Sequence, residues 1–222
     1  ASFDGEIEKV EKLSIELENL QQIKLSIESQ PEYNNAITYT CKICNDTGYK
    51  NGKRCICFNK ALVNACFNEL GVNEQSKQSF SSSIPDSLTK HYALMQEYSN
   101  TFPNTNLLNF VFIGSPGTGK TYLSKCIENE ITKNGYLAIF LSATDLTNIF
   151  LKMHLSEIEK SLIFDILSTC DLLIIDDLGT EPIYKNVTVE YLLTLITMRL
   201  DKNKHFIITT NLTTSELYER YN

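Results

Sequence analysis

The stretch "GSPGTGKT", residues 114–121, decides the fold that the sequence predicts. It follows the apolar segment "NLLNFVFIG" (106–114) and opens the amphipathic segment "KTYLSKCIENEITKNG" (120–135). A loop of the form G-x-x-x-x-G-K-[ST] between a strand and a helix gathers backbone N–H groups and the positive end of the helix dipole, which favour phosphate. An ordinary glycine-rich turn is the alternative interpretation, and the acidic motif described below weighs against it.

We expect this loop to bind ATP or ADP together with Mg²⁺. The Lys120 ammonium would neutralise the β- and γ-phosphates and so take part in catalysis, and the Thr121 hydroxyl would ligate Mg²⁺. The residues expected at the nucleotide are Gly114, Ser115, Pro116, Gly117, Thr118, Gly119, Lys120, Thr121, Tyr122 and Asp176.

A second motif, "LLIIDDLG" (172–179), ends an apolar segment in two adjacent carboxylates. At the end of a parallel strand they emerge at the carboxyl edge of the sheet, the same edge as the phosphate loop. We expect Asp176 to hold Mg²⁺ through water. We expect Asp177, which strand alternation points the other way, to orient or deprotonate the attacking water. A solvated turn is the alternative, but the apolar strand and the phosphate loop favour the functional interpretation.

A third motif, "IITTN" (207–211), ends the last predicted strand at the same edge. The Asn211 amide could hydrogen-bond the γ-phosphate or the attacking water and so report hydrolysis. Asparagine at a strand end is also a common turn former, and Thr213 and Glu216 have the spacing of a capping box for the next helix. We interpret Asn211 as functional because the phosphate loop and the two adjacent aspartates occur in the same chain.

Helical and strand patterns alternate from residue 85 onward. Helices are predicted near 86–98, 120–135, 145–169 and 187–203, and strands at 106–114, 136–143, 171–179 and 205–211. Continuously apolar strands between amphipathic helices indicate a parallel sheet that is covered on both faces. The prediction is a doubly wound α/β domain.

The first third of the chain predicts a separate small module, residues 1–71, whose helical segments cover about 5–30 and 58–70. Residues 5–30 are predicted to form one long helix or a helical hairpin, which either covers its own small domain or presents a face to a partner. Residues 72–84 are rich in Ser and Gln and predict a linker, which leaves 85–222 for the α/β domain.

Two cysteine pairs stand in "CKICNDTGYKNGKRCIC" (41–57). A tight turn with two thiolates, closed by a second pair from an opposing arm, is the arrangement of a tetrahedral zinc site. We expect the ligands to be Cys41, Cys44, Cys55 and Cys57. Because the second pair has the less typical C-x-C spacing, Cys66 or His91 is an alternative ligand. Four buried or inert thiols are the non-metal interpretation, which the polar segment between the pairs disfavours.

The composition of the chain argues against some classes of function. A formal charge of −7 over 222 residues argues against a protein that coats duplex nucleic acid by bulk electrostatics, although a local basic groove remains compatible. No apolar run approaches the roughly 18 residues of a membrane span, and the charged start shows no signal peptide. We expect a cytoplasmic, thiol-reducing environment with no membrane partner.

The phosphate loop, "IIDD" (174–177) and "TTN" (209–211) resemble the AAA+ ATPases in their order and spacing. The runs "LLIIDDLGTEP" (172–182) and "IITTNL" (207–212) resemble the DnaC/DnaI/IstB branch of bacterial helicase loaders and transposition ATPases. This resemblance covers roughly residues 80–222. The cysteine module is similar to the N-terminal part of DnaI-type loaders.

The resemblance implies an ATPase that loads the ring-shaped replicative helicase onto single-stranded DNA during initiation of replication, with ATP as a switch. It implies that the N-terminal module docks on the helicase, and that self-assembly needs the partner or the full-length chain. Asp177 stands where most AAA+ proteins have Glu, which suggests slow, partner-stimulated turnover. Glu181 is a nearby alternative base. Lys152 and Lys160 lie on the helical stretch where this branch faces DNA, although the sequence favours solvated lysines on a helix face.

The expected fold class is therefore a P-loop AAA+ doubly wound parallel sheet with a small N-terminal helical zinc-binding module. The resemblance places an arginine finger and a helical lid after Asn222, so we expect this chain to carry no lid, and Arg220 receives no such role.

Two rival functions remain at the level of sequence. One is an IstB-like transposition ATPase, against which the cysteine module argues. The other is a non-hydrolysing nucleotide-binding adaptor, which the intact Lys120, Thr121 and Asp176 disfavour.

Overall fold

We analysed the chain in a computed structural model, which describes residues 19–26, 38–58, 60–61, 65, 78–80, 88–105, 108–156 and 160–222. The chain divides into two compact units, Ala1–Thr47 and Gly48–Asn222. The boundary predicted at residue 71 and most of the predicted linker at 72–84 lie outside the described residues.

A four-stranded parallel sheet forms the centre of the second unit. Its strands are β3 (Asn109–Ile113), β4 (Ala138–Ser142), β5 (Leu172–Leu178) and β6 (His205–Thr210), and they lie in the order β3-β6-β5-β4. The side chains of residues 172–175 in β5 are fully buried, as expected for a strand with helices over both faces. The sheet brings β3 and β6 together although they are distant in sequence.

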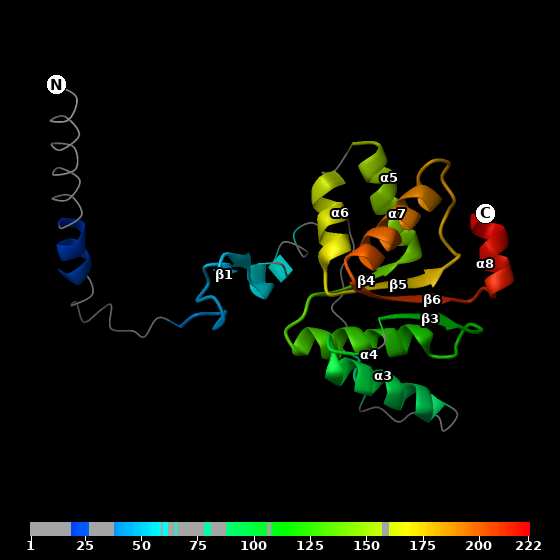
Figure 1. Ribbon diagram of the computed structural model, residues 1–222, viewed down its shortest axis with the longest axis horizontal. Coiled ribbons are helices and arrows are strands. Elements are labelled where there is room, and N and C mark those ends of the chain that lie inside the picture. Colours follow the sequence, from blue (N-terminus) through cyan, green and yellow to red (C-terminus); the bar gives the residue numbers. More distant parts are fainter. Residues whose placement is uncertain are drawn as a thin grey trace. The chain divides into compact units, whose positions relative to one another are not determined.

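Helices cover both faces of this sheet (Figure 1). One layer contains α3 (Thr89–Thr101) and α4 (Lys120–Lys133), and the other contains α5 (Ala143–His154), α6 (Lys160–Thr169) and α7 (Thr188–Asp201). Helix α8 (Thr214–Tyr221) follows β6. The predicted doubly wound α/β architecture is confirmed.

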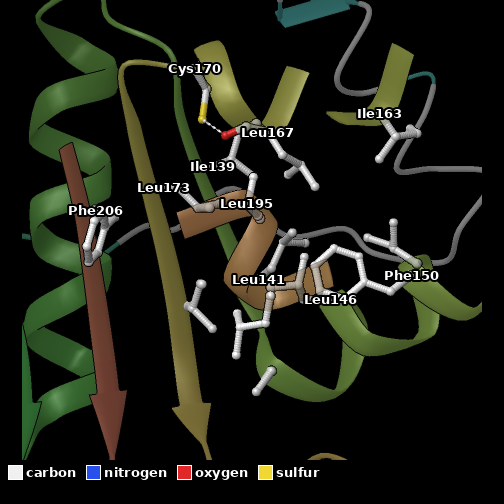
Figure 2. Close-up of a cluster of buried hydrophobic side chains, with 14 of the residues drawn as sticks. Ile139, Leu141, Leu146, Phe150, Ile163, Leu167, Cys170, Leu173, Leu195 and Phe206 are labelled. Atoms are coloured by element: carbon white, nitrogen blue, oxygen red, sulfur yellow. Dashed lines mark hydrogen bonds between the residues drawn. The ribbon is translucent and has the colours of Figure 1, made fainter. Parts of the chain in front are cut away.

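Strand alternation divides the apolar core between the two layers. Figure 2 shows the larger cluster, in which side chains from β4 and β5 pack against α5, α6 and α7; its labelled members are Ile139, Leu141, Leu146, Phe150, Ile163, Leu167, Cys170, Leu173, Leu195 and Phe206. On the opposite face, Leu172, Ile174 and Ile207 pack against α3 and α4. Alternate residues of one strand thus hold helices on opposite sides of the sheet.

Local sequence signals set several helix ends. Helix α4 ends before Gly135, whose φ of 92° is a left-handed conformation that glycine adopts without strain. Thr213 and Glu216 form the predicted capping box at the start of α8. The single helical stretch predicted at 145–169 is wrong in one respect, because α5 ends at His154 and α6 begins at Lys160. Ser156, with a φ of 60°, cannot continue a right-handed helix.

The N-terminal predictions are only partly covered by the described residues. Residues 19–26 are helical, with Leu20, Ile23 and Leu25 between 54% and 64% exposed, and the rest of the helix predicted at 5–30 lies outside the described residues. Strands β1 (Tyr49–Lys50) and β2 (Lys53–Arg54) form a short antiparallel hairpin. Among the described helices, none has the length and apolar character to cross a membrane.

Candidate functional site

The phosphate loop joins the end of β3 to the start of α4, as predicted. Gly119 has a φ of 88° and occupies the N-cap position of α4, which begins at Lys120. A residue with a side chain would be strained in that conformation, so glycine permits the sharp turn from loop to helix. The free N–H groups of the first turn of α4 therefore lie at the carboxyl edge of the sheet, where an anion would meet them.

The Lys120 ammonium has four oxygen acceptors, of which the most distant is the Thr118 hydroxyl at 3.5 Å. It donates to the carbonyl oxygens of Gly114 at 2.6 Å and Ser115 at 3.0 Å, and to the Asn211 side-chain oxygen at 2.8 Å. Asn211 follows β6, the neighbour of β3, so sheet pairing brings the two residues together across the chain. The predicted Lys120 and Asn211 therefore lie within one site.

Asp176 links the loop helix to the sheet. Its carboxylate accepts a hydrogen bond from the Thr121 hydroxyl at 2.9 Å and another from the Thr209 hydroxyl at 2.7 Å. The Asp176 side chain is buried, with 8% of its surface exposed. A hydroxyl and a carboxylate at this separation are hard oxygen ligands of the kind that Mg²⁺ prefers, so the donor set fits the predicted ion.

A β-bulge places Asp177, and here the expectation from strand alternation is wrong. Ile175 pairs with Ile208 and Leu178 pairs with Thr210, so Asp176 and Asp177 together oppose a single residue of β6. Asp177 adopts a φ of 60°, and its N–H donates to the Thr209 hydroxyl at 2.8 Å. Bulges re-aim side chains beside functional sites. In this case the bulge keeps both carboxylates at the same edge.

The bulge completes a chain of side-chain hydrogen bonds from the loop to the acidic pair. The Asn211 amide nitrogen donates to Asp177 at 2.6 Å while the Asn211 oxygen accepts from Lys120. This network borders a pocket of about 470 Å³. The pocket is lined by Gln78, Pro116, Gly117, Thr118, Gly119, Lys120, Thr121, Tyr122, Lys125, Asp177, Thr209 and Asn211.

Glu181, the alternative base, is engaged elsewhere. Its carboxylate accepts from the Gly179 N–H at 2.8 Å and from the Tyr221 hydroxyl of α8, and it lies 3.8 Å from the Arg220 guanidinium. Burial, together with the neighbouring Glu181 carboxylate, raises the pKa of Tyr221 well above its usual value, so Tyr221 remains a proton donor. Glu181 thus fixes the turn after β5 to α8 and is absent from the residues that line the pocket.

A second, more apolar pocket of about 430 Å³ lies on the α3 side of the phosphate loop. Its walls come from α3 and β3, including His91, Tyr92 and Phe112, and it shares Gly119 and Lys120 with the polar pocket. His91 therefore lies on α3 at the wall of this pocket.

The four predicted zinc ligands come together. The sulfur atoms of Cys41, Cys44, Cys55 and Cys57 all lie within 4.8 Å of one another. Four thiolates at about 2.3 Å from a tetrahedral Zn²⁺ would be separated by roughly 3.8 Å, so small side-chain adjustments suit this ion. The alternative ligand His91 is not part of the group, and Cys66 lies outside the described residues.

The loop between the first two cysteines is held by a carboxylate. Asp46 accepts from the N–H groups of Thr40 at 3.0 Å and Cys41 at 2.7 Å, and the Asn45 N–H donates to the Cys41 carbonyl at 2.9 Å. These bonds fix the turn that carries Cys41 and Cys44, which is the preorganisation that a metal site needs.

Together the fold and the site define a P-loop nucleotide-binding protein of the AAA+ type. Residues 79–221 match the family of IstB-like ATP binding proteins, and the chain belongs to this family. The family assignment agrees with the DnaC/DnaI/IstB resemblance expected from the motifs.

Comparison with individual proteins points to the same branch. The replicative helicase loader DnaC of Buchnera aphidicola subsp. Baizongia pistaciae is 34% identical over 88 residues, which are 39% of this chain and 35% of that protein. DnaC of Escherichia coli strain K12 is also 34% identical over 88 residues, covering 38% of this chain and 36% of that protein. The chain thus spans little more than a third of the length of these curated relatives.

A solved structure shows the same fold. The crystal structure of the DnaC helicase loader superimposes with a TM-score of 0.56 at 25% identity, covering 64% of this chain and 86% of that one.

Thr209 is the residue that the sequence interpretation missed. Its hydroxyl donates to Asp176 and accepts from the Asp177 N–H, so it sets both the carboxylate and the bulge. The only sequence signal was its place beside Asn211 at the end of an apolar strand.

We predict that Thr209→Val, which keeps the shape and removes both hydrogen bonds, weakens Mg-nucleotide binding about tenfold, since a hydrogen bond to a charged group contributes about 1.5–3 kcal/mol. Isothermal titration with Mg-ADP measures the change. Thr194→Val is the matched control, because Thr194 is an exposed residue of α7 whose hydroxyl donates to the Glu190 carbonyl one turn earlier in the same helix. Equal affinities of Thr209→Val and the wild type would contradict the role given to Thr209.

Proposed function

We propose that the chain binds Mg-ATP at the phosphate loop and uses it as a switch. The observation that carries this proposal is the hydrogen-bonded network that joins Lys120, Asn211 and Asp177 beside the Thr121–Asp176 pair. A lysine in a glycine-rich loop, a hydroxyl and two carboxylates are the groups that a Mg-triphosphate requires, and they meet at one edge of one sheet.

Each group has a distinct task in this proposal. Lys120 would exchange its contacts with Gly114 and Ser115 for phosphate oxygens. Thr121 and Asp176 would hold the ion, whose chemistry is to neutralise charge on the phosphates. Asp177 would accept the proton of the attacking water. Asn211, which contacts Lys120 and Asp177, would sense whether the terminal phosphate is present.

The proposed cellular role is loading of the replicative DNA helicase onto single-stranded DNA. The curated relatives are named replicative helicase loaders, and the region that matches the IstB-like family, residues 79–221, contains the phosphate loop. The helicase would bind through the N-terminal module. We place this activity in the cytoplasm, and we propose slow turnover that the partner stimulates.

A decisive variant is Asp177→Asn, which keeps a polar side chain of the same size beside Asn211. We expect nucleotide affinity within a few-fold of the wild type, and phosphate release in the presence of helicase and single-stranded DNA reduced about 100-fold or more, because a general base contributes about 10²–10⁴ in rate. Asp171→Asn is the control, since Asp171 pairs with Lys204 on a different part of the sheet.

The loader role is tested by a second measurement in the same reactions. Helicase recovered on circular single-stranded DNA should depend on this chain and on ATP. Recovery that is equal without the chain would contradict the loader role, whereas unchanged phosphate release by Asp177→Asn would contradict the assignment of the base.

We also propose that the four-cysteine group binds one structural Zn²⁺. The support is the convergence of four sulfur atoms and the Asp46 contacts that fix the first turn. Elemental analysis should give about one zinc per chain, and Cys44→Ser should reduce it, whereas Cys126→Ser, at a buried cysteine of α4, should not. A zinc-free preparation whose near-ultraviolet spectrum equals that of the zinc-containing protein would contradict this proposal.

A further inference from the structure

The hairpin β1–β2 has a two-residue turn of a defined type. Tyr49 pairs with Arg54 and Lys50 with Lys53, and the two connecting residues, Asn51 and Gly52, have φ values of 52° and 75°. Two left-handed residues in a two-residue connection form a type I′ turn, whose twist matches that of the paired strands. The pairing therefore places Tyr49 and Arg54 directly opposite each other.

This hairpin lies in the most basic part of the chain. Residues 47–68 contain no Asp or Glu, while they include Lys50, Lys53, Arg54 and Lys60, although the whole chain has a formal charge of −7. Lys50 and Arg54 are exposed. A local positive patch on an acidic protein attracts anionic ligands to one place rather than to the whole surface.

An exposed aromatic ring accompanies the charge. The Tyr49 side chain is 49% exposed, and its ring centroid lies 5.5 Å from that of Phe58. The Arg54 guanidinium carbon lies 5.6 Å from the same Phe58 centroid. Because Tyr49 and Arg54 are cross-strand partners, they share one face of the hairpin, with Phe58 supporting both.

We propose that this hairpin is a binding site for single-stranded nucleic acid, with a base stacking on Tyr49, one backbone phosphate contacting Arg54 on the same face, and a further phosphate contacting Lys50, which strand alternation places on the other face beside the turn. An exposed tyrosine, an arginine fixed beside it and an adjacent lysine are the groups that bind unpaired nucleotides without reading sequence. A duplex fits poorly, because stacking on Tyr49 requires a base that has left its pair. The inference deepens the proposed loader role, since it names residues that would hold the single strand.

The test measures fluorescence anisotropy of labelled oligothymidine with the full 222-residue chain, without nucleotide or helicase. We expect the double variant Lys50→Ala/Arg54→Ala to weaken binding at least tenfold and to reduce the dependence of log K on log salt by about 1.4, since each lost phosphate contact removes about 0.7. The control Lys133→Ala/Lys185→Ala removes the same charge from exposed sites elsewhere and should leave the salt dependence unchanged.

Stacking is tested separately from charge. Tyr49→Leu should weaken binding about tenfold with an unchanged salt dependence, while Tyr49→Phe should bind as the wild type does and shows that the module still folds. Equal binding by Lys50→Ala/Arg54→Ala and its control would overturn the proposal. So would normal DNA binding by the hairpin variants combined with loss of helicase binding, because the hairpin would then be a protein-docking site. Since no ATP is present, a chain that failed as an ATP switch could still pass this test.

Discussion

The Asp176 carboxylate, held between the hydroxyls of Thr121 and Thr209, is the interaction on which the site depends. Thr121 belongs to the first turn of α4, Asp176 to β5 and Thr209 to β6, so the contact joins the phosphate loop to two central strands. A buried carboxylate needs such donors, because loss of its hydrogen bonds would leave a desolvated charge. The Thr121 hydroxyl and the Asp176 carboxylate, which meet in this contact, are the groups that would hold Mg²⁺.

The position of the second carboxylate follows from this first contact. Thr209 donates to Asp176 and can then accept from the Asp177 N–H, which stabilises the left-handed conformation of Asp177. The bulge turns Asp177 toward Asn211, and Asn211 reaches Lys120 in the loop. One side of the nucleotide pocket is therefore a single hydrogen-bonded unit. Replacing one of its residues alters the hydrogen bonds that the other residues make.

The sequence predicts the locally coded parts of this arrangement. The phosphate loop, the strand that ends at Asp176 and the capping box of α8 are each defined by residues close together in the chain, and the structure confirms them. The bulge at Asp177 could not be predicted, because it depends on the register between β5 and β6, which is set by residues about thirty positions apart.

Long-range packing also explains two other features of the structure that the sequence did not predict. Glu181 looks like a second candidate base in sequence, but α8 folds back and engages it through Tyr221. The sequence predicts one helix at 145–169, yet α5 and α6 are separate helices that both pack over the sheet, and no short-range signal marks the break clearly.

Titration of Mg-ATP into the wild-type chain and into Lys120→Ala tests the central claim most directly, namely that the loop and the acidic pair form one nucleotide site. The account predicts saturable binding of one nucleotide to the wild type, loss of measurable binding in Lys120→Ala, and wild-type affinity in the control Lys133→Ala, which removes an exposed lysine from the far end of the same helix. Equal affinity of Lys120→Ala and the wild type would contradict it.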